Sequence, residues 1–212
     1  MELWPNHAEA LKLRGIVLDK LDCSKQALTH YNDSLKLRPN DVSTLMSRGN
    51  LFKHLGCLNE ALDDYTQALE LDPNNPVILN NRGQIFYNLG YYQKAVMDFK
   101  YSINSHHPDS QTLTNLGIAL YHLGFYEEAC VELNHSLVHR PNHNFTLINR
   151  GNTLAQLGRY AEALEDYNHS RNEQQNNPTF LSNRGWVLDN LGHYDEALVD
   201  YTHSLNLRPN HA

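Results

Sequence analysis

The sequence has few of the residues on which several common classes of protein depend. It holds three cysteines in 212 residues, Cys23, Cys57 and Cys130, which cannot all pair inside the chain. No basic and then apolar leader follows Met1, so we expect a reducing, cytoplasmic compartment. No apolar run approaches the ~20 residues of a membrane span, so we expect no membrane association. The 17 Lys and Arg are outnumbered by 24 Asp and Glu, and a net charge of −7 disfavours nucleic acid as a partner.

The chain repeats itself at an interval of 34 residues. That shift aligns "SRGNLFKHLG", "NRGQIFYNLG", "NLGIALYHLG", "NRGNTLAQLG" and "NRGWVLDNLG", with "LRGIVLDKLD" as a looser first copy. With Ala8 as position 1, six copies occupy residues 8-41, 42-75, 76-109, 110-143, 144-177 and 178-211, and residues 1-7 match the tail of a preceding repeat. Such a period is typical of an array of short units, each packing on its neighbours.

Fixed positions within the repeat predict a pair of helices. Leu fills positions 4 and 14 in all six copies, which lie on one helical face. Gly at position 8 and Ala at position 20, also in all six, allow two helices to approach closely. Position 15 is Gly in five copies and can take the left-handed conformation that ends a first helix. All eight prolines lie at repeat junctions, where a second helix must stop.

This pattern accounts for every glycine. Six stand at position 8 and five at position 15, which are all eleven in the chain. None remains for a loop that cradles phosphates. A nucleotide-binding enzyme is therefore disfavoured, and we expect no catalytic residues and no cofactor.

The repeat pattern resembles that of the tetratricopeptide repeat family across residues 8-211. The matching features are Gly at position 8, Ala at 20, Pro at 32 and an aromatic residue at 11 or 24. Leu133 departs from the aromatic at 24, and His107 and Gln175 depart from the proline. The resemblance implies an all-α fold, a right-handed superhelical α-solenoid of antiparallel helix pairs. It also implies that the first helices line a concave groove for a protein or peptide partner.

Charged residues recur at positions 7 and 23 of the repeat. In two antiparallel helices joined by a turn near position 15, these two positions lie opposite each other. Position 7 is arginine in five copies: Arg14, Arg48, Arg82, Arg150 and Arg184. Position 23 is acidic in five: Asp64, Asp98, Glu132, Asp166 and Asp200. We expect a structural ion pair within each repeat that has both groups.

Thirteen histidines raise the question of a metal site. Glu132, His135 and His139 are spaced so that one helix could present them together. However, the position shared by His135, His169 and His203 recurs in repeats ~10 Å apart, too far for a shared ion. We therefore expect no metal.

Position 6 is asparagine in four consecutive copies: Asn81, Asn115, Asn149 and Asn183. An amide both donates and accepts, so a ladder of amides ~10 Å apart matches about three residues of extended chain. The ladder resembles one in the groove of O-linked N-acetylglucosamine transferase, whose catalytic domain has no counterpart here. The alternative is that these amides cap or bridge neighbouring helices.

The resemblance also places positions 2, 5, 9, 12 and 13 in the groove. Those of copies three to five include Asn80, Gln84, Tyr87, Asn88, Tyr121 and Asn152, together with Val77, Gln111, Thr114, Ile118, His122, Phe145, Ile148, Ala155 and Gln156. Only His122 could be ionic, so the ligand is expected to be largely uncharged. The clamp for acidic C-termini found in related co-chaperones begins with Lys12, but Ile16 breaks it.

The sequence thus favours a non-catalytic protein-interaction module that binds an extended peptide segment in its groove. The alternative is the substrate-recruiting arm of a larger glycosyltransferase-like enzyme. The chain starts and stops in register with the repeat and shows no polar capping helix after the last copy. End-to-end self-association is therefore a further expectation.

Overall fold

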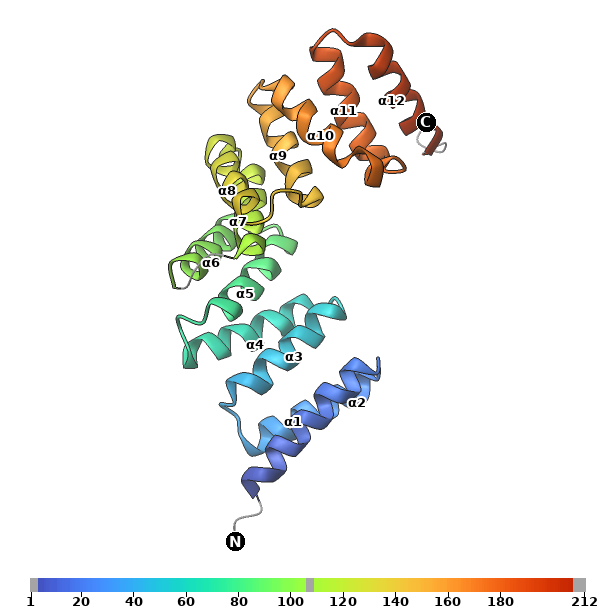
Figure 1. Ribbon diagram of the computed structural model, residues 1–212. Helices are drawn as coiled ribbons and strands as arrows, with labels where there is room; N and C mark the ends of the chain where they lie inside the picture. Colours follow the sequence, from blue (N-terminus) through green and yellow to red (C-terminus); the bar gives the residue numbers. More distant parts are fainter. Residues whose placement is uncertain (1–3, 106–108, 208–212) are drawn as a thin grey trace. The chain divides into compact units, whose positions relative to one another are not determined.

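The computed structural model describes residues 4–105 and 109–207, and every regular element among them is an α-helix. The chain divides into two compact units, Met1–His107 and Pro108–Ala212. Figure 1 labels the helices of both. The first unit contains α1 (Trp4–Lys20), α2 (Ser24–Leu37), α3 (Val42–His54), α4 (Leu58–Leu71), α5 (Pro76–Asn88) and α6 (Tyr92–Ser105). The second contains α7 (Ser110–His122), α8 (Tyr126–His139), α9 (Asn144–Gln156), α10 (Tyr160–Gln174), α11 (Pro178–Asn190) and α12 (Tyr194–Leu207).

Each odd-numbered helix packs against the even-numbered helix that follows it, and within a unit each pair packs on the next. In repeats two to six the first helix occupies positions 1 to 13, and every second helix begins at position 17. The expected architecture, a stack of helix pairs, is therefore confirmed within both units. In the first repeat α1 begins at Trp4, inside the seven residues assigned to the tail of a preceding repeat.

The glycine at position 8 makes room for the large side chain at position 24. A Cβ on Gly83 would lie 2.7 Å from Cε1 of Phe99, and one on Gly117 would lie 2.6 Å from Cγ of Leu133. Both of those side chains are fully buried. The close approach predicted from Gly and Ala is confirmed, and the space it leaves is filled by the residue at position 24.

The turn between the two helices of a repeat uses the glycine at position 15 as expected. Gly56, Gly90, Gly124, Gly158 and Gly192 all have φ between 73° and 81°. In the first repeat Asp22 occupies this place with φ 57°. Aspartate tolerates the left-handed region better than most residues.

Four of the first helices, α3, α5, α7 and α11, are capped at their N-termini by the last residue of the preceding repeat. Asp41 accepts from the backbone N–H of Thr44 at 2.9 Å, and Asp109 accepts from that of Thr112 at 3.0 Å. Asn75 and Asn177 cap α5 and α11 in the same way. His143 holds this position before α9 and makes no cap to the backbone. The helix starts are thus fixed by side chains at the repeat junctions.

Candidate functional site

The predicted groove positions of α3 and α5 meet across the two helices. Asn81 Nδ2 on α5 donates to Asn50 Oδ1 on α3 at 3.4 Å, and the same oxygen accepts from the Tyr65 hydroxyl at 2.6 Å. Lys53 Nζ on α3 donates to Asn81 Oδ1 at 3.3 Å and to Gln84 Oε1 at 3.4 Å. Side chains at positions 6, 9 and 12 therefore share one face of the first helices.

The second unit repeats the first part of this arrangement. Asn183 Nδ2 on α11 donates to Asn152 Oδ1 on α9 at 3.0 Å, and Asn152 accepts from the Tyr167 hydroxyl at 2.7 Å. We call this chain, from tyrosine at position 24 through asparagine at position 9 to asparagine at position 6 of the next repeat, the amide relay. It joins neighbouring repeats, as the alternative interpretation of the position-6 asparagines expected.

Each of the other two position-6 asparagines makes a bond within its own helix. Asn149 Nδ2 donates to the carbonyl of Phe145 at 2.7 Å, and Asn115 Oδ1 accepts from Gln111 Nε2 at 3.1 Å. The amides predicted as a uniform ladder thus differ in their surroundings: Asn81 and Asn183 bridge to a neighbouring repeat, whereas Asn149 bonds to its own helix.

The remaining predicted groove residues differ in how far they are exposed. Tyr87 and Tyr121 are half-buried, and each ring lies tilted beside that of a second tyrosine. The ring centroids are 5.5 Å apart for Tyr87 and Tyr92 and 5.4 Å apart for Tyr121 and Tyr126. Asn88 is exposed and Asn80 is half-buried. Peptide contact by these residues stays a prediction.

Three positions that the sequence placed in the groove are buried: Thr114, Ile118 and Ala155. Thr114 belongs to a network of hydroxyls, in which its Oγ1 lies 2.8 Å from Oγ of Ser136 and 2.8 Å from Oγ1 of Thr146. These three side chains pack between repeats and present little surface to a ligand, so placing them on an open groove was wrong.

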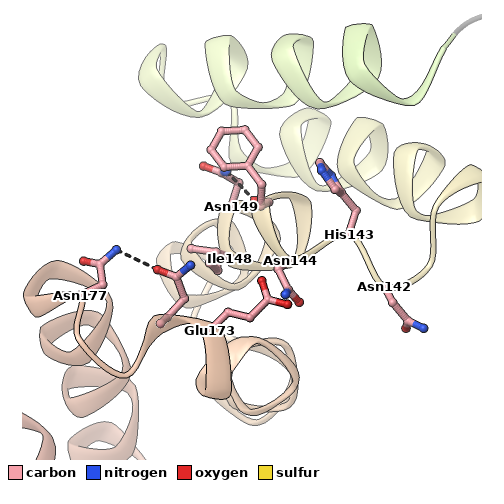
Figure 2. Close-up of a pocket in the computed structure, with 9 residues that line it drawn as sticks. Asn142, His143, Asn144, Ile148, Asn149, Glu173 and Asn177 are labelled. Carbon is pink, nitrogen blue, oxygen red and sulfur yellow. Dashed lines mark hydrogen bonds between the residues drawn. The ribbon is translucent and has the colours of Figure 1, made fainter.

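The second unit has a hollow of about 680 Å³ beside the start of α9 (Figure 2). Three of its lining residues were predicted to face the groove: Phe145, Ile148 and Asn149. The rest come from the preceding turn, the first residue of α9, the end of α10 and the cap of α11: Asn142, His143, Asn144, Glu173, Gln174 and Asn177. Amides and one exposed aromatic ring dominate this wall, which suits a peptide backbone with an apolar side chain.

Burial keeps the histidines of this face neutral. Burial lowers the pKa of His122, and burial together with Arg140 lowers the pKa of His143. His143 Nδ1 lies 2.8 Å from the Thr146 hydroxyl. At neutral pH a lowered pKa favours the uncharged imidazole in both residues, and the carboxylate of Glu173 is the acidic group in the wall of the hollow.

The predicted ion pairs lie behind this face and are confirmed in four repeats. The carboxylates of Asp64, Asp98, Asp166 and Asp200 accept from Arg48, Arg82, Arg150 and Arg184 at 2.6 to 2.8 Å. Arg48, Arg150 and Arg184 also donate to the asparagine at position 25 of the preceding repeat. The arginines therefore join repeats as well as helices.

Sequence reasoning missed the serine at position 27. Ser34, Ser102, Ser136 and Ser204 donate to the backbone carbonyl at position 1 of their own repeat, at 2.8 to 2.9 Å. Serine stands there in five of six copies, and this repetition was the available signal. The bond satisfies a carbonyl at the start of the first helix.

Within residues 4–105 and 109–207, no group of three His, Cys, Asp or Glu side chains is placed to hold a metal ion. In the candidate set, His135 Nδ1 lies 3.7 Å from Glu132. No helix among the same residues is long and apolar enough to cross a membrane.

Comparisons with known proteins agree with this architecture. A TPR repeat model matches residues 49–90, and two tetratricopeptide repeat models match residues 146–170 and 178–211. The chain therefore contains tetratricopeptide repeats, and its described residues form six helix pairs, as six such repeats would. No curated protein sequence matches it.

Solved structures with the same fold have low sequence identity. PilF of Pseudomonas aeruginosa superposes with a TM-score of 0.82 at 18% identity, covering 99% of this chain and 95% of its own. PilW, a type IV pilus biogenesis factor, gives 0.81 at 18% identity, with 96% and 94% covered. YrrB, described as a TPR protein with an unusual peptide-binding site, gives 0.71 at 20% identity, with 85% and 93% covered.

Proposed function

We propose that the chain is a non-catalytic protein-interaction module that binds an extended, largely uncharged peptide segment along the exposed face of its first helices. The observation that carries the proposal is the hollow at the start of α9, because three residues predicted for the groove line it. A peptide-binding site described for YrrB, which has the same fold, is in keeping with this proposal.

The chemistry of the hollow indicates how a segment would be held. The amide side chains of Asn142 and Asn144 can donate to and accept from a peptide backbone, whereas that of Asn177 already caps α11 and donates to Gln174 at 2.9 Å. Phe145 is 52% exposed and offers a ring on which an apolar side chain of the ligand can pack. Affinity would come from the backbone, and selectivity from the side chain that meets Phe145.

The test compares two phenylalanines of the second unit that are equally exposed. Phe145 lines the hollow, whereas Phe125, at 51% exposure, precedes α8 outside it. Peptides are first selected from a random library on the unaltered protein. We expect Phe145→Ala to weaken their binding on the order of tenfold, about 1.4 kcal/mol, and Phe125→Ala to leave it within about twofold, a change of less than 0.5 kcal/mol.

Equal loss in both variants, or no loss in either, would show that the hollow is not the binding site. Failure to select any peptide would remove the proposed function itself. Circular dichroism of both variants checks that the fold is intact.

The recruiting arm of a larger transferase remains the alternative function, since the same groove would serve it. The two functions are distinguished by whether this chain is part of a transferase. The selected segment is crosslinked in cells, and a crosslinked protein that carries both this chain and a transferase would favour the arm.

End-to-end self-association is proposed as an additional property. Leu205 on α12 is 70% exposed, whereas its equivalents Leu35, Leu69 and Leu137 are 6 to 8% exposed because the next first helix covers them. Val17 on α1 is 56% exposed, whereas its equivalents Leu51, Ile85 and Val187 are at most 1% exposed. The two faces are the halves of the contact that joins repeats within each unit.

A further inference from the structure

Lys53 differs from the other cations that lie partly buried in the first unit. Arg48, Arg82 and Lys12 each hold a carboxylate at 2.6 to 2.8 Å. Lys53 is half-buried at position 12 of α3, and among the described residues its ammonium has two amide oxygens as partners, at 3.3 and 3.4 Å. Burial lowers the pKa of Lys53. Its positive charge is thus partly desolvated, and no anion lies beside it in the part of the chain that the structure describes.

The second unit shows that the amide relay does not need this lysine. Three repeats further along, the relay of Tyr167, Asn152 and Asn183 forms with an inter-repeat bond of 3.0 Å. The residue equivalent to Lys53 is Ala155, and the residue equivalent to Gln84 is Trp186. A structural role in joining repeats therefore does not explain the lysine.

We infer that Lys53, with the amides of Asn50, Asn81 and Gln84 around it, binds a carboxylate of the partner segment. The ligand class is an extended peptide that carries one acidic group opposite α3, within an otherwise uncharged stretch. The carboxylate belongs either to an Asp or Glu side chain or to the peptide's C-terminus. The inference rests on the proposed function, since the carboxylate arrives on the segment bound by that face.

The geometry favours an anion at this place over other ligands. An ammonium can donate three hydrogen bonds, and the ammonium of Lys53 makes two long ones to neutral amide oxygens. A carboxylate would accept a shorter and stronger bond than these oxygens do. The side chain lies on the same face as the relay, between two first helices, so a chain running across them passes it. A carboxylate of the ligand would give Lys53 a negatively charged partner, as Asp64 and Asp98 do for Arg48 and Arg82.

The experiment uses the full chain and selected peptides that contain one acidic residue. Each is compared with its Gln or Asn counterpart, on the unaltered protein and on Lys53→Met, which keeps the aliphatic stem. We expect the acidic peptide to bind about tenfold more tightly to the unaltered protein, with a preference lost in the variant. Raising the salt concentration should weaken the acidic peptide only on the unaltered protein.

Two further arms make every outcome decisive. Peptides with free and amidated C-termini separate a terminal carboxylate from a side-chain one. Lys100→Met, which removes an exposed lysine on α6, is the matched control and should leave the preference unchanged. Titration of the unaltered protein with glutarate, followed by NMR at the lysine Cε resonances, reports on the site even if no peptide is found.

A preference for the acidic peptide that survives in Lys53→Met overturns the inference, as does a library that yields binders without any acidic preference. Loss of cooperative unfolding in Lys53→Met would mean that the lysine is structural, and it would overturn the inference as well. If no peptide binds but glutarate shifts the Lys53 resonance alone, the carboxylate site stands and the proposed function fails.

Discussion

The ion pair between Arg82 and Asp98 allows the sharpest test of how the two helices of one repeat are held together. Two hydrogen bonds of 2.8 Å join the guanidinium to the carboxylate. The Asp98 side chain is 6% exposed and that of Arg82 is 21% exposed. Arg82→Leu removes the cation and leaves a buried carboxylate alone.

The expected loss follows from that burial. Removing one partner of a fully buried pair costs ~3–5 kcal/mol, and water at the edge of Arg82 reduces this to ~2–4 kcal/mol. Replacing both residues with leucine removes the stranded charge, so the double variant should unfold within ~1 kcal/mol of the unaltered protein. The coupling between the two sites should therefore exceed ~1 kcal/mol.

Urea unfolding followed by circular dichroism measures these free energies, with amide exchange in α5 and α6 locating the change. Lys36→Ala is the control, because Lys36 is 75% exposed in its pair with Asp33, and such pairs contribute ~0–1 kcal/mol. Peptide affinity of the folded protein should not change in Arg82→Leu. If the double variant is no more stable than Arg82→Leu, the buried carboxylate is not the cause and the reasoning is refuted.

Three further predictions follow from single features. His143→Asp should stabilise the protein by ~1 kcal/mol, because it supplies the missing cap to α9, and Asp41→His should destabilise it by removing the cap of α3. Thermal melts in which the melting temperatures of both variants shift in the same direction would contradict this. Burial raises the pKa of Tyr31 to about 12, so the unfolded chain loses this proton at a lower pH than the folded protein does. The free energy of unfolding should therefore fall as pH rises from 10 towards 12, and it should fall less steeply in Tyr31→Phe. Equal pH dependence of the two proteins would count against this prediction. Leu198→Glu with Leu205→Glu should abolish self-association in analytical ultracentrifugation, and an unaltered chain that stays monomeric at high concentration would remove that proposal.

The fold could be predicted from the sequence because its determinants are local and repeat six times. Gly83 and its equivalents meet a large side chain at a fixed offset of 16 residues, and Gly90 and its equivalents take positive φ whatever surrounds them. The Arg82–Asp98 pair was equally accessible, since both partners belong to one repeat. Such features depend only on the antiparallel pairing of two helices.

Contacts between repeats were harder to predict, because they depend on which side chains face each other across a junction. Thr114 was assigned to the groove from its position number, but it lies among hydroxyls supplied by Ser136 and Thr146. The serine at position 27 was missed because its partner is a backbone carbonyl, which carries no signature in the sequence. Position within a repeat indicates a face, and the neighbouring repeat decides whether that face is open.

The position-6 asparagines show the same limit and also how it can be overcome. Asn81 and Asn183 follow repeats that have asparagine at position 9, and both bridge to it. Asn149 follows a repeat with Ile118 at position 9, and its amide turns back to its own helix. The pair of residues at position 9 of one repeat and position 6 of the next therefore separates Asn81 and Asn183 from Asn149, although the residue at position 6 alone does not. A bridging amide already uses one N–H to hold its neighbour, so replacing it with alanine should affect stability as well as binding, whereas the Asn149 amide can exchange its backbone partner for a ligand without loosening the junction.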